Sequence, residues 1–288
     1  MLLEIAIGDA YGAGFEFCGH EKIMLSNTLE KYVPHELGIQ AGCYTDDTQM
    51  SIAVAEVLLS DSDCSANVFA DAYVRCYKRD QRLGYAKGLQ GLLNLCGNGA
   101  DLRQRISPES RRNGAAMRSV PLGLIGDKKL LALAAREQAI VTHNTAEGIL
   151  SSHVVAFMSH ALLYDKAKLA ELPELVLKMT GFALRNDWFA EVECDALQTL
   201  HAVNTALQAN RGMSKLLLDC VNFGGDVDSV AAIAMGLASL TPEYVVDIPA
   251  SLMSGLESGK FGSRYLRQLD VALAERYPVL NVHLERQP

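Results

Sequence analysis

Two groups of acidic residues, far apart in the sequence, have the side chains that a bound cation requires. Asp46 and Asp47 stand together in YTDDTQMSIAVAEVLL, at the start of a long apolar run. Asp226, Asp228 and Ser229 form D-x-D-S in NFGGDVDS, again in front of an apolar segment. Adjacent carboxylates repel one another unless water, a proton or a cation separates them. Two such groups in one chain therefore favour metal binding as the chemistry of these residues.

Helix capping is the alternative explanation for each group. Thr45 or Asp46 can accept hydrogen bonds from the unpaired N–H groups of a first helical turn, and Asp46 and Gln49 have the spacing of a capping box. A calcium-binding EF-hand is excluded at the second group. Its loop needs glycine at the sixth position and glutamate at the twelfth, whereas counting from Asp226 places alanine and leucine there.

The elements that must position these residues are predicted to be helices. Apolar residues recur with a period near 3.6, as on one face of an α-helix, and Met50, Val54, Val57 and Leu58 form one such series. The other series run through residues 69–76, 85–96, 128–140, 145–163, 166–185, 193–209, 228–240 and 264–277. YVVDI at 244–248 is the only fair candidate for a strand. We therefore predict an all-α fold.

Composition excludes several classes of protein. Of the 288 residues 49% are hydrophobic, and no linker, repeat or low-complexity tract divides them, so we expect a single domain over residues 1–288. The net charge of −8 argues against a broad nucleic-acid or anionic-membrane surface. The seven scattered cysteines form no C-x-x-C pair and predict the reduced thiols of a cytoplasmic protein. A signal peptide and a membrane-spanning segment are not expected either.

Polar, glycine-bearing breaks between the predicted helices are the places where binding groups are expected. Five stand out: GDAYGAGFE (8–16), GCYTDDTQ (42–49), SPESRRNGAAMR (107–118), THNTAE (142–147) and NFGGDVDS (222–229). The first break adds Glu16 to the acidic residues of the chain. In the last, Gly224 and Gly225 allow the backbone to approach a ligand closely or to take positive φ, although two glycines also make a plain turn.

These five segments, in this order, resemble the ADP-ribosylglycohydrolases, the family that includes the dinitrogenase reductase-activating glycohydrolase. The resemblance spans nearly the whole chain. It implies a compact orthogonal bundle of many helices, which agrees with the periodicity. It also implies two Mg²⁺ or Mn²⁺ ions and hydrolysis of the bond between ADP-ribose and a modified side chain. The substrate would be an ADP-ribosylated protein or a small ADP-ribosyl conjugate, and ADP-ribose would be the product.

The resemblance assigns metal ligands to both acidic groups. They are Thr45, Asp46, Asp47, Asp226, Asp228 and Ser229. Oxygen ligands suit Mg²⁺ and Mn²⁺. The family more often has threonine where this chain has Ser229 and Val227, and the serine hydroxyl keeps a ligand oxygen. Glu16 and Asp47 are the expected catalytic carboxylates, because either can position water or manage its proton. The alternative for Glu16 is a solvated loop acid.

The resemblance also assigns residues to the substrate. They are Asn113, Gly114, Ala115 and His143. Backbone N–H groups of residues 113–115 would meet a diphosphate at a helix N-terminus, and glycine leaves room for close approach. His143 can also be a packed or capping residue, and Arg118 can also be a structural ion-pair donor. Asp9 can bind near the metals or make a structural hydrogen bond to the backbone.

Two other classes of protein fit part of the sequence. D-x-D-S-V at 226–230 fits the nucleophile motif of haloacid-dehalogenase-like phosphatases. That motif should follow an early parallel strand, whereas here it lies late in the chain and is followed by predicted helix. A non-catalytic protein that binds ADP-ribosylated or toxin partners, as an immunity protein does, is the other alternative. The filled ligand positions argue against an inactive enzyme. Specificity for the linked side chain lies in loops outside the matched segments.

Overall fold

Helices supply almost all of the regular structure in residues 1–281, the part of the chain that the computed structural model describes. The α-helices are α1 (Leu2–Ala13), α2 (His20–Ser26), α3 (Asp46–Leu59), α4 (Ala66–Arg79), α5 (Lys87–Leu95), α6 (Gly99–Arg105), α7 (Gly114–Met117), α8 (Lys128–Ile140), α9 (Ala146–Leu163), α10 (Leu172–Thr180), α11 (Ala196–Ala209), α12 (Met213–Asn222), α13 (Val227–Ala238), α14 (Ala250–Gly255) and α15 (Ser263–Arg276). The short 3₁₀ helices are η1 (Val120–Leu124), η2 (Leu169–Glu171) and η3 (Pro278–Leu280). The predicted all-α fold is confirmed.

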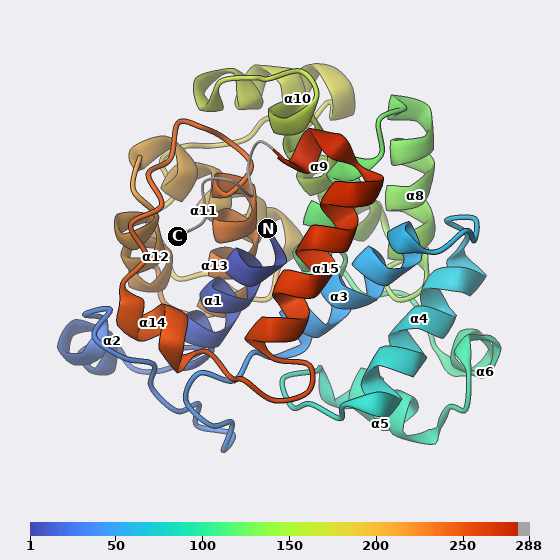
Figure 1. Cartoon of the computed structure of the whole chain (residues 1–288), viewed down its shortest axis with the longest axis horizontal. Helices are drawn as coiled ribbons and strands as arrows, with labels where there is room; N and C mark the ends of the chain where they lie inside the picture. The colour runs from blue at the N-terminus through green and yellow to red at the C-terminus, as the bar shows by residue number, and fades with distance from the viewer. Residues whose placement is uncertain (282–288) are drawn as a thin grey trace.

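Two helices from distant parts of the sequence, α1 and α13, pack together at the centre of the molecule (Figure 1). Glycines in α1 allow the two backbones to touch. A Cβ atom on Gly8 would lie 2.6 Å from the carbonyl carbon of Ala231, and one on Gly12 would lie 2.8 Å from the nitrogen of Asp228. Only glycine fits at such distances. The close packing of α1 therefore fixes the first turn of α13, which carries Asp228.

The other helices enclose this pair. α3 and α15 contact α1, whereas α11 and α12 contact α13. Every residue of α13 is buried, which explains why its sequence is apolar or small on all faces. Helix α9 is long and apolar enough to span a membrane, but 72% of it is buried inside the fold. It therefore serves here as a core helix.

Two expectations about individual elements are wrong. Residues 8–13 of GDAYGAGFE belong to α1 and are not a break between helices, because their glycines serve helix packing. YVVDI at 244–248 is not a strand, since Val245 forms one isolated bridge with Gly212. Within residues 1–281 every β-bridge is isolated in this way. The phosphatase alternative needs a parallel sheet beside D-x-D-S, so the fold excludes it.

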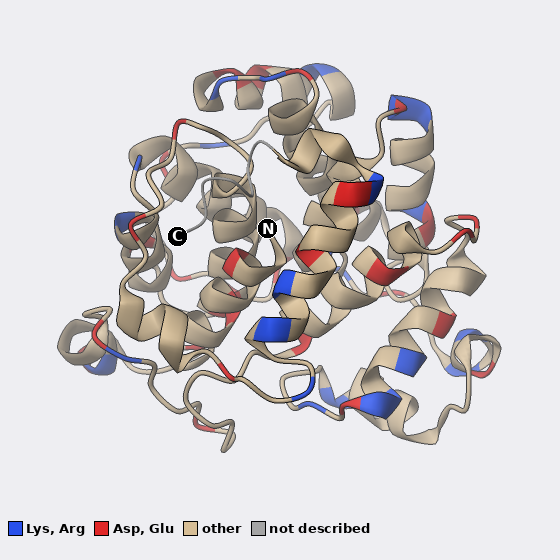
Figure 2. Cartoon of the chain, viewed as in Figure 1, with Lys and Arg blue, Asp and Glu red and all other residues tan. Residues whose placement is uncertain are grey.

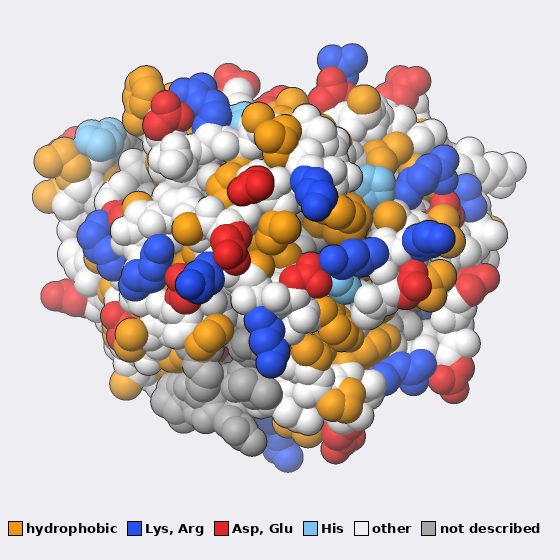
Figure 3. All heavy atoms as spheres, turned by 90° about the horizontal axis from the view of Figure 1, so that it is seen from above, with side chains coloured by type: hydrophobic (Ala, Val, Ile, Leu, Met, Phe, Trp, Pro, Cys, Tyr) orange, Lys and Arg blue, Asp and Glu red, His pale blue; other side chains and the backbone are white. Residues whose placement is uncertain are grey.

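Charged side chains are mixed on the outer helices. Lys and Arg occur beside Asp and Glu on several helices in Figure 2, and on the face in Figure 3 both signs are interspersed with apolar side chains. Neither view shows a continuous basic stripe of the kind that follows a nucleic-acid backbone. The seven cysteines are all free, as expected of reduced thiols.

Candidate metal centre and substrate cavity

A cavity of about 810 Å³ lies over the N-terminal ends of α3 and α13. Five carboxylates line it: Glu16, Asp46, Asp47, Asp226 and Asp228. They come from the turn after α1, the first turn of α3 and the start of α13. Ser229 also lines the cavity, whereas Thr45 is fully buried and is not among the lining residues. The fold thus brings together the two acidic groups that are distant in sequence.

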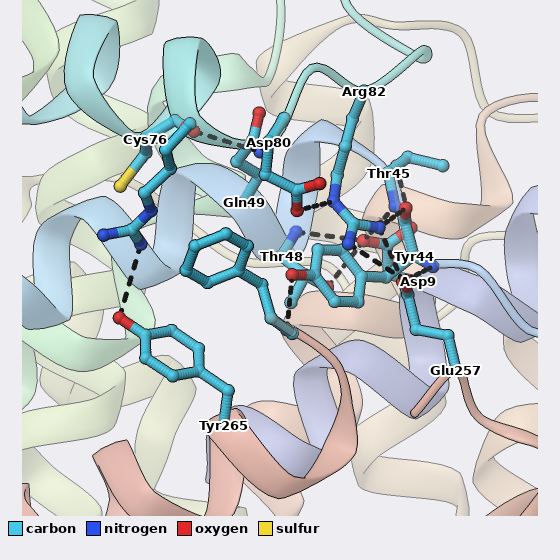
Figure 4. A network of polar contacts seen from close by, with 12 residues as sticks. Asp9, Tyr44, Thr45, Thr48, Gln49, Cys76, Asp80, Arg82, Glu257 and Tyr265 are labelled. Carbon is cyan, nitrogen blue, oxygen red and sulfur yellow. Dashed lines mark hydrogen bonds and ion pairs between the residues drawn. The ribbon is translucent and has the colours of Figure 1, made fainter. Parts of the chain in front are cut away.

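Asp9, a buried residue of α1, organises the start of α3 (Figure 4). Its carboxylate accepts hydrogen bonds from the backbone N–H groups of Thr45 (3.0 Å) and Thr48 (2.9 Å). The two threonine hydroxyls also donate to it, at 2.7 and 2.6 Å. Asp9 therefore caps α3 from a neighbouring helix. Of its two possible roles, the structural hydrogen bond to the backbone is the one observed.

The capping explanation for YTDDTQM is consequently wrong. Thr45 occupies the N-cap position, but its side chain accepts no capping bond. Gln49, the proposed partner in a capping box, donates instead to the carbonyl of Asp80 and accepts from the Tyr85 hydroxyl. Since Asp9 fulfils the capping requirement, the carboxylates of Asp46 and Asp47 are available for another purpose.

Two buried carboxylate oxygens in the cluster lack a hydrogen-bond partner among residues 1–281. They are Oδ1 of Asp47 and Oδ1 of Asp228. In addition, Glu16, Asp226 and Asp228 each offer an oxygen within 4.8 Å of the other two. Buried polar atoms are nearly always paired, and unpaired carboxylate oxygens are the ligands of hard divalent cations. The residues present therefore fit a divalent metal.

Burial and mutual repulsion raise the pKa values of these carboxyl groups. For Asp46, Asp47 and Asp228 the pKa lies well above the ordinary value of 3.8, first because burial removes water and next because neighbouring carboxylates repel the charge. Burial also raises the pKa of Asp226. A bound cation opposes both effects, because positive charge favours the ionised form of an acid.

The second acidic group is held by residues from a different part of the chain. Asn113 donates from Nδ2 to Asp226 Oδ2 at 2.8 Å, and the Cys194 thiol forms a further hydrogen bond to Asp226. Gly224 and Gly225 have φ values of +74° and +83°, which glycine adopts without strain. This turn lets the N–H of Asp226 reach the carbonyl of Val192 at 2.8 Å.

Glu16 has a histidine partner in the segment between α2 and α3. Glu16 Oε2 lies 2.6 Å from His35 Nε2. The backbone N–H of Leu37 donates to His35 Nδ1 at 2.7 Å, so Nδ1 carries no proton and Nε2 is the donor. His35 is buried. The ring therefore fixes one oxygen of Glu16 and leaves the other for the cavity.

An arginine anchors the backbone just before the aspartate doublet (Figure 4). Arg82 donates to the carbonyl of Tyr44 at 2.9 Å and to Glu257 Oε2 at 3.0 Å, and its guanidinium lies 3.5 Å from the centre of the Tyr44 ring. Glu257 in turn accepts the N–H of Tyr44 at 3.1 Å. Asp80 accepts a further bond from Arg82 at 2.8 Å. Both backbone polar groups of Tyr44 are thus held in place.

Gly84 lies directly against the first acidic group. Its φ is +110°, and a Cβ atom there would lie 2.6 Å from Asp46 Oδ1 and 2.8 Å from the Cβ of Thr45. Gly84 and the neighbouring Tyr85 both line the cavity. The Asp46 carboxylate fits here because glycine has no side chain.

A profile of the family described as ADP-ribosylglycohydrolase matches residues 1–283. The chain belongs to the ADP-ribosylglycohydrolase family. Its members hydrolyse conjugates of ADP-ribose, which is a glycosidase activity. The resemblance found in the sequence is therefore confirmed.

Several known proteins are similar to this glycohydrolase over most of its length. The ADP-ribosylarginine hydrolase Tri1 of Serratia proteamaculans (strain 568) is 26% identical over 84% of this chain and 70% of its own. The ADP-ribosyl-[dinitrogen reductase] glycohydrolase of Rhodospirillum rubrum is 27% identical over 94% of both chains. A solved structure titled ADP-ribosylglycohydrolase-related protein complex has a TM-score of 0.75 at 24% identity, covering 97% of this chain and 96% of that one. This structural likeness shows the shared fold.

The residues expected at the substrate take different positions in this glycohydrolase. Gly114 and His143 line the cavity together, and a Cβ on Gly114 would lie 2.7 Å from His143 Cε1. Ala115 is fully buried. The N–H of Asn113 already donates to the carbonyl of Cys194, and α7 is a single turn of four residues. A four-residue helix has only a small dipole, and the Asn113 side chain supports Asp226, although Asn113 also lines the cavity. The contact between residues 113–115 and a diphosphate stays a prediction.

Sequence reasoning missed three residues that shape the site of this glycohydrolase: His35, Arg82 and Gly84. Arg82 and Gly84 lie in KRDQRLG, a polar break between two predicted helices that had the character of the five segments singled out. His35 lies in a segment without periodicity. Nothing in its neighbourhood pointed to Glu16, because their meeting depends on how the segment after α2 folds back.

Proposed function

We propose that this chain is a divalent-metal-dependent hydrolase that releases ADP-ribose from a modified protein side chain or a related ADP-ribosyl conjugate. The observation that carries the proposal is the pair of buried, unpartnered oxygens on Asp47 and Asp228, beside a cavity of about 810 Å³. In a member of this family, such oxygens are suited to hold metal next to a bound ADP-ribosyl group. Arginine is the first linked side chain to test, because the Serratia relative is named an ADP-ribosylarginine hydrolase.

Six side chains would hold two Mg²⁺ or Mn²⁺ ions. They are Thr45, Asp46, Asp47, Asp226, Asp228 and Ser229. The Thr45 hydroxyl donates its proton to Asp9, so the lone pairs of its oxygen remain free for a cation. When bound, such ions supply positive charge that orients ribose hydroxyls and makes a water molecule acidic.

The carboxylates of this chain would manage the water and its proton. Hydrolysis adds water at the anomeric carbon and breaks the bond to the side-chain atom, through a transition state with oxocarbenium character. Glu16, fixed through Oε2 by His35, has its other oxygen available to accept a proton from water and return it to the leaving group. Asp47 would orient the same water.

The experiment offers ADP-ribosyl-arginine and ADP-ribosyl-serine peptides to the purified protein with Mg²⁺ or Mn²⁺ and measures released ADP-ribose. We expect release from at least one peptide, reversible loss of activity with a chelator, and recovery when metal is restored. Undiminished turnover in metal-free buffer would contradict the metal-dependent proposal. Binding of a peptide without release would instead identify a non-catalytic binder.

A further inference from the structure

Arg118 is a fully buried cation whose contacts are all with uncharged groups. It donates from Nε to Gln138 Oε1 at 2.5 Å and from Nη2 to the Gln138 carbonyl at 3.0 Å. The guanidinium lies 4.5 Å from the centre of the Tyr73 ring and contacts Met50 Sδ. No carboxylate forms an ion pair with it in residues 1–281, so the ion-pair role considered from the sequence is wrong. A buried arginine remains charged, and a positive charge without a carboxylate partner is unusual.

The remaining contact of Arg118 leads to the cavity. Its Nη2 donates to the hydroxyl oxygen of Thr142 at 2.8 Å, and that oxygen lies 2.6 Å from Nδ1 of His143. A guanidinium only donates, so Thr142 accepts from Arg118. The hydroxyl proton is then free to be donated, and His143 Nδ1 is the acceptor within reach. With the hydroxyl proton donated to Nδ1, that nitrogen carries no proton of its own and Nε2 does. The reverse arrangement, in which Nδ1–H donates to the same oxygen, would leave the hydroxyl proton without an acceptor in the hydrogen bonds that the described residues form.

The surroundings of His143 keep the ring neutral. Burial is the main cause that lowers its pKa to about 3, followed by repulsion from Arg118 and Arg112. The ring lines the cavity and packs over Gly114, where a Cβ atom would lie 3.0 Å from Nε2. No hydrogen-bond acceptor contacts Nε2 within the described chain. Its proton is directed at whatever occupies the cavity.

We propose that Arg118 is a positioning residue that, through Thr142, holds His143 as a neutral Nε2–H donor for an acceptor oxygen of the bound ADP-ribosyl group. The inference rests on the proposed function for the identity of the ligand. It assigns His143 a donor role and excludes it as a general base. It also explains why Gly114 must lack a side chain, since the donor reaches the cavity across that position.

Gln138 connects Arg118 to the backbone beside Gly114, on which the His143 ring packs. The same amide that accepts from Arg118 donates through Nε2 to the carbonyl of Ala115 at 2.9 Å, next to Gly114. One buried amide therefore sets both the guanidinium behind His143 and the backbone that the ring packs against. The separation between the donor and Gly114 is held constant by this shared support.

The test begins with the tautomer of His143 in the full chain, read from ring ¹⁵N shifts and assigned by comparison with His143→Gln. We expect the Nε2–H form in wild type and in Thr142→Ser, and a loss of that preference in Thr142→Val, which has no hydroxyl. Calorimetry with ADP-ribose and Mg²⁺ provides the second measurement. Removing a hydrogen bond to a charged group should weaken binding about ten- to a hundredfold in His143→Leu, and by a smaller factor in Thr142→Val, which leaves the ring in place.

The variant His143→Gln distinguishes a hydrogen-bond donor at this position from a general base. Glutamine places an amide N–H near the position of Nε2, so His143→Gln should recover most of the affinity that His143→Leu loses. An Nδ1–H form or an imidazolium in the wild-type protein would overturn the proposal without any variant. Unchanged tautomer and affinity in Thr142→Val would do the same. If wild type shows the expected tautomer but binds no ADP-ribose, the positioning of His143 by Arg118 and Thr142 stands and the proposed function fails.

Discussion

At the scale of single residues, unpartnered oxygens separate the candidate metal ligands from an ordinary buried acid. Asp9 is buried like Asp47 and Asp228, yet Thr45 and Thr48 donate to its oxygens. Asp47 and Asp228 each keep one oxygen without such a bond. Leaving a buried charged group unpaired costs more than about 1–3 kcal/mol. Substitution at these two positions should therefore separate stability from ligand binding.

Replacing either aspartate with asparagine should raise the thermal stability of the metal-free protein. Asp47→Asn and Asp228→Asn remove a buried charge that neighbouring carboxylates repel. Mn²⁺ at a hundred times its Kd should stabilise wild type by about 2.7 kcal/mol and the variants far less. Thermal melting with and without Mn²⁺ measures both effects, alongside release of ADP-ribose. Variants that keep the metal-induced rise and the activity would show that these residues hold no cation.

The stability of the metal-free protein should also depend on pH through the carboxyl group of Asp47. The pKa of Asp47 is raised above its ordinary value of 3.8 in the folded protein. Its contribution to stability is therefore complete below about pH 4 and is lost as the pH rises through the folded-state pKa. The melting temperature of wild type relative to Asp47→Asn should fall from about pH 4 upwards, and saturating Mg²⁺ should abolish that trend. A difference independent of pH would contradict the raised pKa.

Gly84→Ala should weaken metal binding beyond its effect on folding. A methyl group there would lie 2.6 Å from Asp46 Oδ1, and the φ of +110° adds strain. Disturbing a ligand in this way lowers metal affinity about 10- to 100-fold in comparable sites. Gly181→Ala is the matched control, because Gly181 has a φ of +75° but no atom within 4 Å of its Cβ position. Equal metal affinities for the two variants, measured by calorimetry, would show that Gly84 is not needed to position the metal ligands.

At the scale of elements, periodicity predicted most of the long helices well, including the buried α9 and α13, but it missed α1. Helix α8 has the bounds expected at 128–140, and α9 differs from its expected range by one residue. The segment 166–185 is shorter than expected, as η2 and α10, because Gly181 ends α10 in the left-handed region. Helix α1 was missed because glycine signals a break in sequence, whereas here it permits contact with α13.

Gly12→Ala should therefore destabilise the fold and the metal site together. The added methyl would lie 2.8 Å from the nitrogen of Asp228 and 2.9 Å from the carbonyl oxygen of Val227, so the first turn of α13 must move. Overpacking of this kind costs about 1–3 kcal/mol. In Gly91→Ala, also within a helix but with nothing within 4 Å, the change should be neutral or stabilise by up to about 1 kcal/mol. Denaturant unfolding and Mn²⁺ titration measure the two effects.

In the loops of the site, the acidic residues could be predicted from the sequence, whereas the contacts that position them could not. Asp46, Asp47, Asp226 and Asp228 stand out because acids at the start of apolar runs need a reason. The cap on α3 was misassigned, since Asp9 reaches it from another helix. Such contacts depend on the crossing of helices, and the local sequence contains no sign of them.

At the scale of the whole molecule, the segment between α14 and α15 supports the metal site from a distance. Glu257 holds Arg82 and the N–H of Tyr44, two residues before Asp46. Tyr44 also donates its hydroxyl to the carbonyl of Phe261 at 2.8 Å (Figure 4). Late residues of the chain thereby fix the backbone that presents the first acidic group.

Glu257→Gln should lower metal affinity although residue 257 does not line the cavity. The amide keeps the shape of the side chain but removes the charge that Arg82 contacts through two nitrogens, at 2.5 and 3.0 Å. We expect a loss of about tenfold in Mn²⁺ affinity, typical of residues that support a ligand. Asp165→Asn, which breaks an exposed ion pair with Lys128, should change neither affinity nor stability measurably. Identical Mn²⁺ affinities for both variants would show that Glu257 does not support the metal site.

The contact between α1 and α13 also has a consequence for synthesis of the protein. Helix α1 is translated long before α13, yet all twelve of its residues are buried in the finished fold. During most of translation its apolar surface has no native partner, and exposed surface of this kind promotes aggregation and engages chaperones. Both acidic groups exist together only once α13 has left the ribosome. A nascent chain interrupted before that point carries only Thr45, Asp46 and Asp47, which are half of the candidate metal ligands.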